Sequence, residues 1–147
     1  MKILFIDMDN VLVDFPSAFP RVDSELFKKY PEKDEIPGIF SLMDPMPGAV
    51  EAYEKLSKKY DTYILSTAPW KNETAWSDKL LWVKKHLGDG DNIHKRLILS
   101  HHKNLCLGDY LIDDRTANGV SNFKGEHIHF GTEKFPNWEA VTKYLIK

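Results

Sequence analysis

The stretch that decides the fold is ILFIDMDNVLVDF, residues 3–15. Its first four residues, Ile3–Ile6, form a short apolar run that is typical of a strand buried on both faces. Two carboxylates, Asp7 and Asp9, follow at once. A charged group at the mouth of a buried strand costs stability unless it is paired or bound to a cation. The stretch therefore predicts a buried strand that delivers acidic side chains to a polar site.

Further apolar runs alternate with helical patterns along the rest of the chain. We expect strands at 62–65, 96–99, 110–112 and 126–130, and helices at 17–30, 47–59, 73–87 and 138–146, the last capped by Asn137. This alternation indicates a parallel sheet that is covered on both faces. The predicted fold is a single α/β domain over residues 1–147, with residues 16–46 inserted after the first strand as a small cap.

Composition excludes several classes of protein. The 20 basic and 22 acidic residues give a net charge of −2 and are scattered, so no surface for a nucleic-acid polymer is predicted. The longest apolar run is too short to span a bilayer, so we expect no membrane segment. The single cysteine, Cys106, cannot form an internal disulfide, which favours the cytoplasm. The sequence leaves the oligomeric state open, a homodimer included.

Polar side chains follow the ends of the predicted strands. They are Asp7, Asp9, Ser66, Thr67, residues 101–103, Asp113 and Asp114. Because ligands of parallel sheets bind at the carboxyl ends of the strands, we expect these side chains to converge. Mg²⁺ prefers oxygen ligands and is often held by one or two carboxylates together with substrate phosphate. Lys103 would offset the negative charge, and Thr67 would donate a hydrogen bond to a phosphoryl oxygen.

The spacing of Asp7 and Asp9 also suits a chemical step. A carboxylate nucleophile can accept a phosphoryl group as an aspartyl-phosphate. The leaving oxygen then needs a proton, and the water that attacks later needs a base. A second carboxyl group two residues away can serve both needs in turn.

At this point the chain resembles a known family. The stretch 7–11 (DMDNV), Thr67, Lys103 and the pair Asp113-Asp114 are similar, in order, to the four motifs of the haloacid dehalogenase-like (HAD) superfamily. Further stretches at 45–52, 66–69, 82–85 and 108–115 resemble the 5′(3′)-deoxyribonucleotidases more narrowly. The resemblance implies a Rossmannoid three-layer sandwich with a small helical cap, and a Mg²⁺-dependent phosphomonoesterase acting on deoxyribonucleoside monophosphates.

The resemblance also implies roles for single residues. Asp7 would be the nucleophile and Asp9 the general acid and base, while Thr67 and Lys103 would hold the phosphoryl group. Mg²⁺ would be bound by Asp7, the backbone carbonyl of Asp9 and Asp113, with Asp114 in support. The expected substrate-binding residues are Phe15, Trp70, Lys71 and Phe40, in an apolar, aromatic pocket that disfavours a ribose 2′-hydroxyl.

Some residues depart from the family's pattern, and others allow a different interpretation of the function. Asn10 stands where the family often has Gly, Ala68 where the animal enzymes commonly have Ser, and the cap is shorter than theirs. A sugar phosphate is therefore an alternative substrate. A receiver-like signalling module is a further alternative, although its motif order differs. His127 and His129 share one face of a strand as a metal pair could, but with no third ligand we interpret them as ordinary strand residues.

Overall fold

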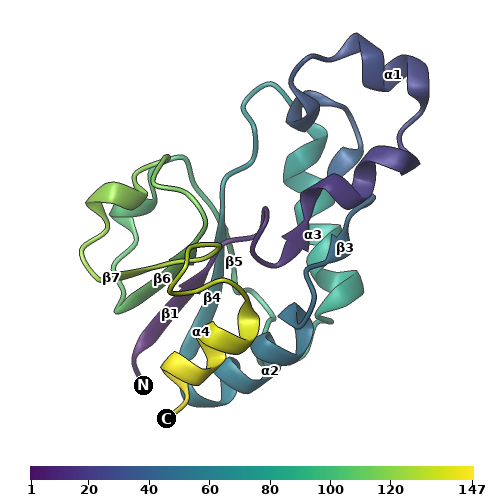
Figure 1. The fold of residues 1–147 in the computed structure, drawn as a ribbon. Helices are drawn as coiled ribbons and strands as arrows, with labels where there is room; N and C mark the ends of the chain where they lie inside the picture. The colour runs from purple at the N-terminus through teal and green to yellow at the C-terminus, as the bar shows by residue number, and fades with distance from the viewer.

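The computed structural model describes all residues, 1–147, and is built on a five-stranded sheet (Figure 1). The strands are β1 (Ile3–Ile6), β4 (Asp61–Ser66), β5 (Leu97–Leu99), β6 (Tyr110–Asp113) and β7 (Glu126–His129). They lie in the order β5-β4-β1-β6-β7, and every pairing between neighbours is parallel. All five predicted strands and the parallel sheet are thereby confirmed.

Three of the four predicted helices are also confirmed. They are α2 (Ala49–Lys59), α3 (Thr74–His86) and α4 (Trp138–Leu145). The side chain of Asn137 caps α4 by accepting a hydrogen bond from the Ala140 amide at 3.0 Å, as the sequence predicts.

The prediction of one helix over 17–30 is wrong. The chain forms a 3₁₀ helix, η1 (Phe15–Arg21), and then a separate helix, α1 (Ser24–Lys29). Pro20 lies inside η1, where it cannot donate a backbone hydrogen bond, and Val22 is extended. Asp23 then starts a new helix, because its carboxylate accepts a hydrogen bond from the amide of Leu26.

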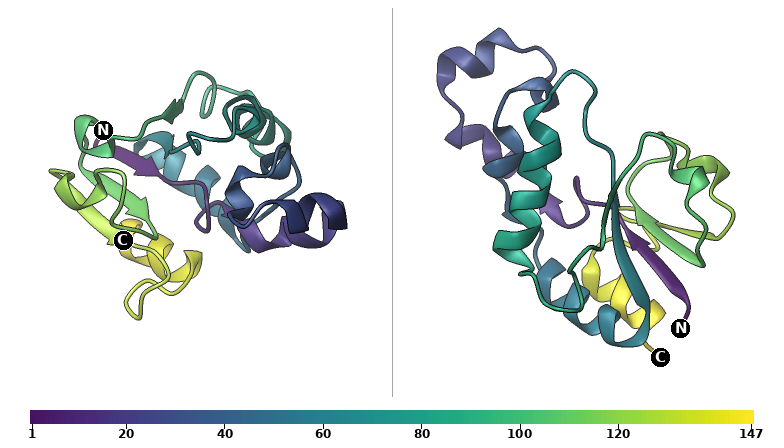
Figure 2. Two further views of the ribbon diagram at one scale, coloured as in Figure 1. Left: turned by 90° about the horizontal axis from the view of Figure 1, so that it is seen from above. Right: turned by 180° about the vertical axis from the view of Figure 1, so that it is seen from behind.

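The two faces of the sheet are covered differently. Helices α2 and α4 pack side by side on one face, where a core of 29 buried residues includes Leu4, Ile64 and Ile112 (Figure 1). The opposite face carries a smaller cluster of five buried residues. It is covered by segments that include η4 (Lys103–Leu105) and η5 (Val120–Asn122) rather than by a long helix (Figure 2).

The cap segment leaves the sheet after β1 and returns at α2. Its base is a two-stranded antiparallel ribbon of β2 (Val13–Asp14) and β3 (Asp44–Pro45). Two short 3₁₀ turns complete it, η2 (Lys33–Glu35) and η3 (Ile39–Ser41), and η3 packs against α3. Helix α1 lies at the end of the cap that is farthest from the sheet (Figure 1). No helix of the chain combines the length and the apolar character needed to cross a bilayer.

Candidate active site

The turn after β1 sends Asp7 and Asp9 in different directions. The amide of Asp7 donates to the carbonyl of Ile112 at 2.9 Å, which extends the pairing of β1 with β6 by one hydrogen bond. The chain then turns around the carbonyl of Met8, which accepts the amides of residues 11, 12 and 13. Asn10 has a φ of +59° in this turn, a conformation that glycine adopts freely and that asparagine tolerates better than most residues. The departure from the family's Gly is therefore compatible with the turn.

Lys103 joins the first and last acidic motifs. Its Nζ donates to Asp7 Oδ1 at 2.9 Å and to Asp113 Oδ2 at 2.7 Å, and all three residues are buried. Burial alone would lower the pKa of Lys103, but the two carboxylates outweigh it and raise the pKa above its ordinary value. The ammonium group is thus held charged between the two acids.

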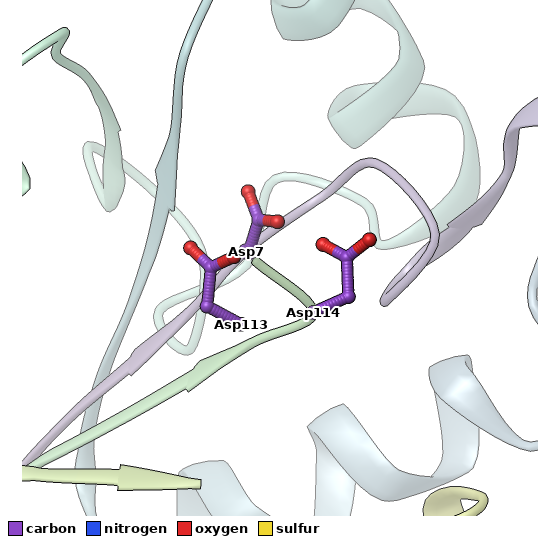
Figure 3. Close-up of side chains that lie close together, drawn as sticks. All are labelled: Asp7, Asp113 and Asp114. Carbon is purple, nitrogen blue, oxygen red and sulfur yellow. The ribbon is translucent and has the colours of Figure 1, made fainter. Parts of the chain in front are cut away.

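Three carboxylates then gather around one point. Oxygens of Asp7, Asp113 and Asp114 lie within 4.8 Å of one another at the carboxyl ends of β1 and β6 (Figure 3). Burial, followed by the charge of Asp7, raises the pKa of Asp113 to about 6 and that of Asp114 to about 7. Asp114 Oδ1 is buried without any hydrogen-bond partner. A crowded set of oxygens with one unpaired atom fits a hard cation such as Mg²⁺, and it places Asp114 in the cluster itself.

The side chain of Asp9 lies apart from this cluster. Both of its oxygens accept hydrogen bonds from Lys79 Nζ at 3.2 Å. The Asp9 side chain is 32% accessible, but the loss of hydration around its carboxyl group still raises its pKa. The charge of Lys79 opposes that rise. Asp7 and Asp9 therefore have different electrostatic partners, Lys103 for one and Lys79 for the other.

Lys79 is a residue of the site that the sequence did not predict. It is fully buried in α3, a helix in which lysine is normally assigned to the solvent face. A signal was present, because Lys79 lies four residues after Ala75 and four before Val83, in the apolar register of the helix.

The histidine pair of β7 also has an unexpected place. The Nε2 atom of His127 lies 2.9 Å from the Asp113 carbonyl, and that of His129 lies 3.0 Å from the Asp114 carbonyl. The two rings stack with centroids 4.8 Å apart. The pair supports the backbone that presents the acidic cluster, and it is not among the groups that could hold a metal ion.

The acidic cluster opens into a cavity of about 440 Å³. Its lining includes the predicted residues Asp7, Asp9, Phe15, Thr67, Trp70, Lys103, Asp113 and Asp114. The lining also includes His101, from the predicted stretch 101–103, and Asp34, Arg115 and Asn118, which the sequence did not predict. Only 3 of the 15 lining residues are hydrophobic, so the expectation of an apolar pocket is wrong, although the aromatic residues Phe15 and Trp70 do line the cavity. The polar loops after β5 and β6 supply side chains that strand patterns do not reveal.

The predicted substrate contacts differ in whether they line the cavity. Trp70 lines the cavity and is 80% exposed, whereas Phe40 is 2% exposed and does not line it. Phe40 instead packs behind Phe15, with ring centroids 5.8 Å apart. Lys71 is exposed and does not line the cavity either. Thr67 lines the cavity, and its hydroxyl donates to the carbonyl of Ser100 at 2.7 Å.

Comparison with known proteins agrees with this geometry. The family model described as 5′ nucleotidase, deoxy (Pyrimidine), cytosolic type C protein matches residues 34–141, well over half of the chain. The chain belongs to this family. This cytosolic type C nucleotidase family is a family of phosphoric monoester hydrolases, which accounts for an acidic cluster beside a polar cavity.

Individual members of the nucleotidase family are similar over most of the chain. A protein of Vibrio phage KVP40, provisionally named a 5′(3′)-deoxyribonucleotidase, is 57% identical over 144 residues, covering 97% of this chain and 84% of its own. The human 5′(3′)-deoxyribonucleotidase, cytosolic type, is 27% identical over 168 residues, covering 94% of this chain and 77% of its own.

A solved structure shares the fold. A haloacid dehalogenase-like family hydrolase from Xanthomonas campestris matches with a TM-score of 0.54 and 11% identity, covering 99% of this chain and 96% of its own. The predicted HAD-like Rossmannoid fold is thereby confirmed.

Proposed function

We propose that the protein is a Mg²⁺-dependent 5′(3′)-deoxyribonucleotidase that hydrolyses deoxyribonucleoside monophosphates through an aspartyl-phosphate on Asp7. The observation that carries this proposal is the Lys103 bridge, which holds Asp7 beside Asp113 at the floor of a polar cavity. Membership of the nucleotidase family and the names of its relatives support the same reaction.

The proposed steps use the chain's own side chains. Lys103 donates a hydrogen bond to Asp7 and offsets charge on the incoming phosphoryl group. An Asp7 oxygen attacks phosphorus while Asp9 gives a proton to the departing nucleoside oxygen. Asp9, now ionised, takes a proton from the water that hydrolyses the aspartyl-phosphate. The raised pKa of Asp9 suits a group that must begin protonated.

The metal proposal rests on the carboxylate cluster. Asp7, Asp113 and the backbone carbonyl of Asp9 would hold Mg²⁺, and the unpaired oxygen of Asp114 adds a further ligand or a support. A bound Mg²⁺ would neutralise phosphoryl charge and relieve the repulsion among the carboxylates.

The cavity itself favours a second candidate substrate. Its mostly polar lining, with Asp34, Arg115 and Asn118, suits a hydroxyl-rich leaving group as well as a nucleoside. A sugar phosphate is therefore the second candidate. The preference for a deoxyribonucleotide rests on the family, since most of the lining is polar and does not by itself disfavour a 2′-hydroxyl.

Phosphate release from the purified protein tests the proposal. We expect turnover of deoxyuridylate with Mg²⁺ and none with excess chelator, and slower turnover of uridylate. Faster turnover of sugar phosphates than of nucleotides would favour the second candidate. Absence of phosphate release from every phosphomonoester would contradict the proposed function.

The remaining features extend the proposal. Residues 16–46 would act as a cap on a single domain, since Asp34 from this segment lines the cavity. We propose a cytoplasmic location, in keeping with the single cysteine, and a small nucleotide as the partner of the site. Gel filtration would decide whether the protein is a homodimer.

A further inference from the structure

Lys79 is a buried cation whose side chain does not contact the cavity. The residue is 0% exposed and is absent from the cavity lining. A buried ammonium group is costly unless its partners compensate for lost hydration. Its role is therefore to be read from those partners and not from contact with a substrate.

The partners of Lys79 come from three separate parts of the fold. Its Nζ lies 3.2 Å from both carboxylate oxygens of Asp9, in the turn after β1. It donates to Ser66 Oγ, at the end of β4, at 2.7 Å. It also lies 4.5 Å from the centroid of the Phe40 ring, in η3 of the cap. The ammonium group is thus contacted by the half-buried Asp9 and by the buried residues Ser66 and Phe40.

Asp9 has no other side-chain anchor. Apart from Lys79, no side chain or amide donates a hydrogen bond to its carboxylate. The equal distances to both oxygens define the orientation of the carboxyl group, which is otherwise free to rotate above a turn. Removing the ammonium group leaves that orientation undefined.

We infer that Lys79 is the positioning residue for Asp9, holding the proposed acid and base in place without touching the substrate. This inference rests on the proposed phosphatase activity. In the step concerned, an Asp7 oxygen bonds to phosphorus, the bond from phosphorus to the alcohol oxygen breaks, and the Asp9 proton passes to that oxygen. In this first step, a misplaced Asp9 impairs only the protonation of the departing alcohol oxygen.

Phe40 extends the same arrangement to the cap. Its ring lies between the Lys79 ammonium group and Phe15, which lines the cavity. The position of Asp9 is therefore tied to the aromatic wall of the cavity through two contacts.

Two substrates with different leaving groups distinguish a loss of Asp9 positioning from general damage to the active site. An alkyl leaving group, such as the nucleoside of a deoxyribonucleotide, needs a proton when it departs. The p-nitrophenolate of p-nitrophenyl phosphate is a stable anion and does not. The ratio kcat/KM includes only the steps up to departure of the alcohol, so later hydrolysis of the aspartyl-phosphate does not enter.

Lys79→Met is the direct test, with Lys85→Met, an exposed lysine of the same helix, as the matched control. For Lys79→Met we expect kcat/KM to fall about 10²-fold on deoxyuridylate and only about threefold or less on p-nitrophenyl phosphate, within the usual range of acid catalysis. Equal losses on both substrates would overturn the inference. A wild-type protein inactive on both would instead contradict the proposed function.

A double-variant measurement covers the case in which Lys79→Met does not fold. Asp9→Asn together with Lys79→Met removes both charges, so no buried carboxylate is left unpaired. If Lys79 acts only through Asp9, the double variant has the same kcat/KM on deoxyuridylate as Asp9→Asn alone. A further loss of about tenfold or more would mean that Lys79 has another role in the reaction, and would overturn the inference.

Discussion

Lys103 and Asp113, ten residues apart in the chain, form a buried ion pair with 2.7 Å between Nζ and Oδ2. The same ammonium group bonds to Asp7. We expect Lys103→Met to destabilise the fold by roughly 3–5 kcal/mol, because it leaves buried carboxylates without their cation. Urea unfolding measures this loss. Lys124→Met, at an exposed lysine, is the control, and equal stability of the two variants would contradict the expectation.

Asp7→Asn removes the proposed nucleophile while changing the shape of the side chain little. We expect kcat to fall by roughly 10⁴-fold or more, since an amide does not form the acyl-phosphate. Asp91→Asn, at an exposed position, serves as the control. Substantial activity in a correctly folded Asp7→Asn protein would exclude the aspartyl-phosphate route.

The carboxylate cluster predicts stabilisation by Mg²⁺ that does not depend on activity. A ligand that binds only the folded state raises Tm, by an amount that grows with its concentration relative to Kd. We expect Mg²⁺ to raise the Tm of the wild type and chelator to reverse the change. The increase should be smaller in Asp114→Asn, whose unpaired oxygen belongs to the cluster. An equal rise in the Tm of Asp114→Asn and of the wild type would contradict a role of Asp114 in the metal site.

Asn72 anchors the cap to the loop after β4. It is buried, and its Nδ2 donates to the carbonyls of Asp34 and Ile36 at 2.9 and 3.0 Å. Asn72→Ala removes both hydrogen bonds and leaves the Asp34 carbonyl without a partner, which should cost about 1–3 kcal/mol of stability. Because Asp34 lines the cavity, we also expect a higher KM with a nearly unchanged kcat. Steady-state kinetics measure both constants, with Asn122→Ala at an exposed site as the control. A change in kcat as large as the change in KM would contradict the expectation.

The Arg21–Asp44 pair predicts an acid-sensitive contact in the cap. Two guanidinium nitrogens bond to the Asp44 carboxylate at 2.9 and 2.8 Å, and the hydrogen bonds to Arg21 lower the pKa of Asp44 below its ordinary 3.8. The stabilisation is thus complete above the unfolded pKa and is lost as pH falls through the lower folded value. We expect the Tm of the wild type to exceed that of Asp44→Asn slightly at neutral pH. The gap should close in strong acid, and a gap that is independent of pH would refute this origin.

The sequence by itself determined the sheet and the gathering of its acidic motifs. Buried apolar runs such as Ile3–Ile6 are local signals, and parallel pairing brings the residues after them to one edge. The convergence of Asp7, Lys103 and Asp113 follows from that rule alone. The Asn137 cap is equally local, because it depends on residues three positions apart.

Only the tertiary structure decided which side chains serve the cavity. Lys79 pairs with Asp9, 70 positions away in the chain, and its apolar register in α3 indicates burial but not this partner. Phe40 belongs to the hydrophobic core and also contacts the ammonium group of Lys79, and the cavity lining is polar because the loops after separate strands supply most of it. Such contacts depend on how the cap packs against α3, and the period of a sequence carries no information about packing between distant segments.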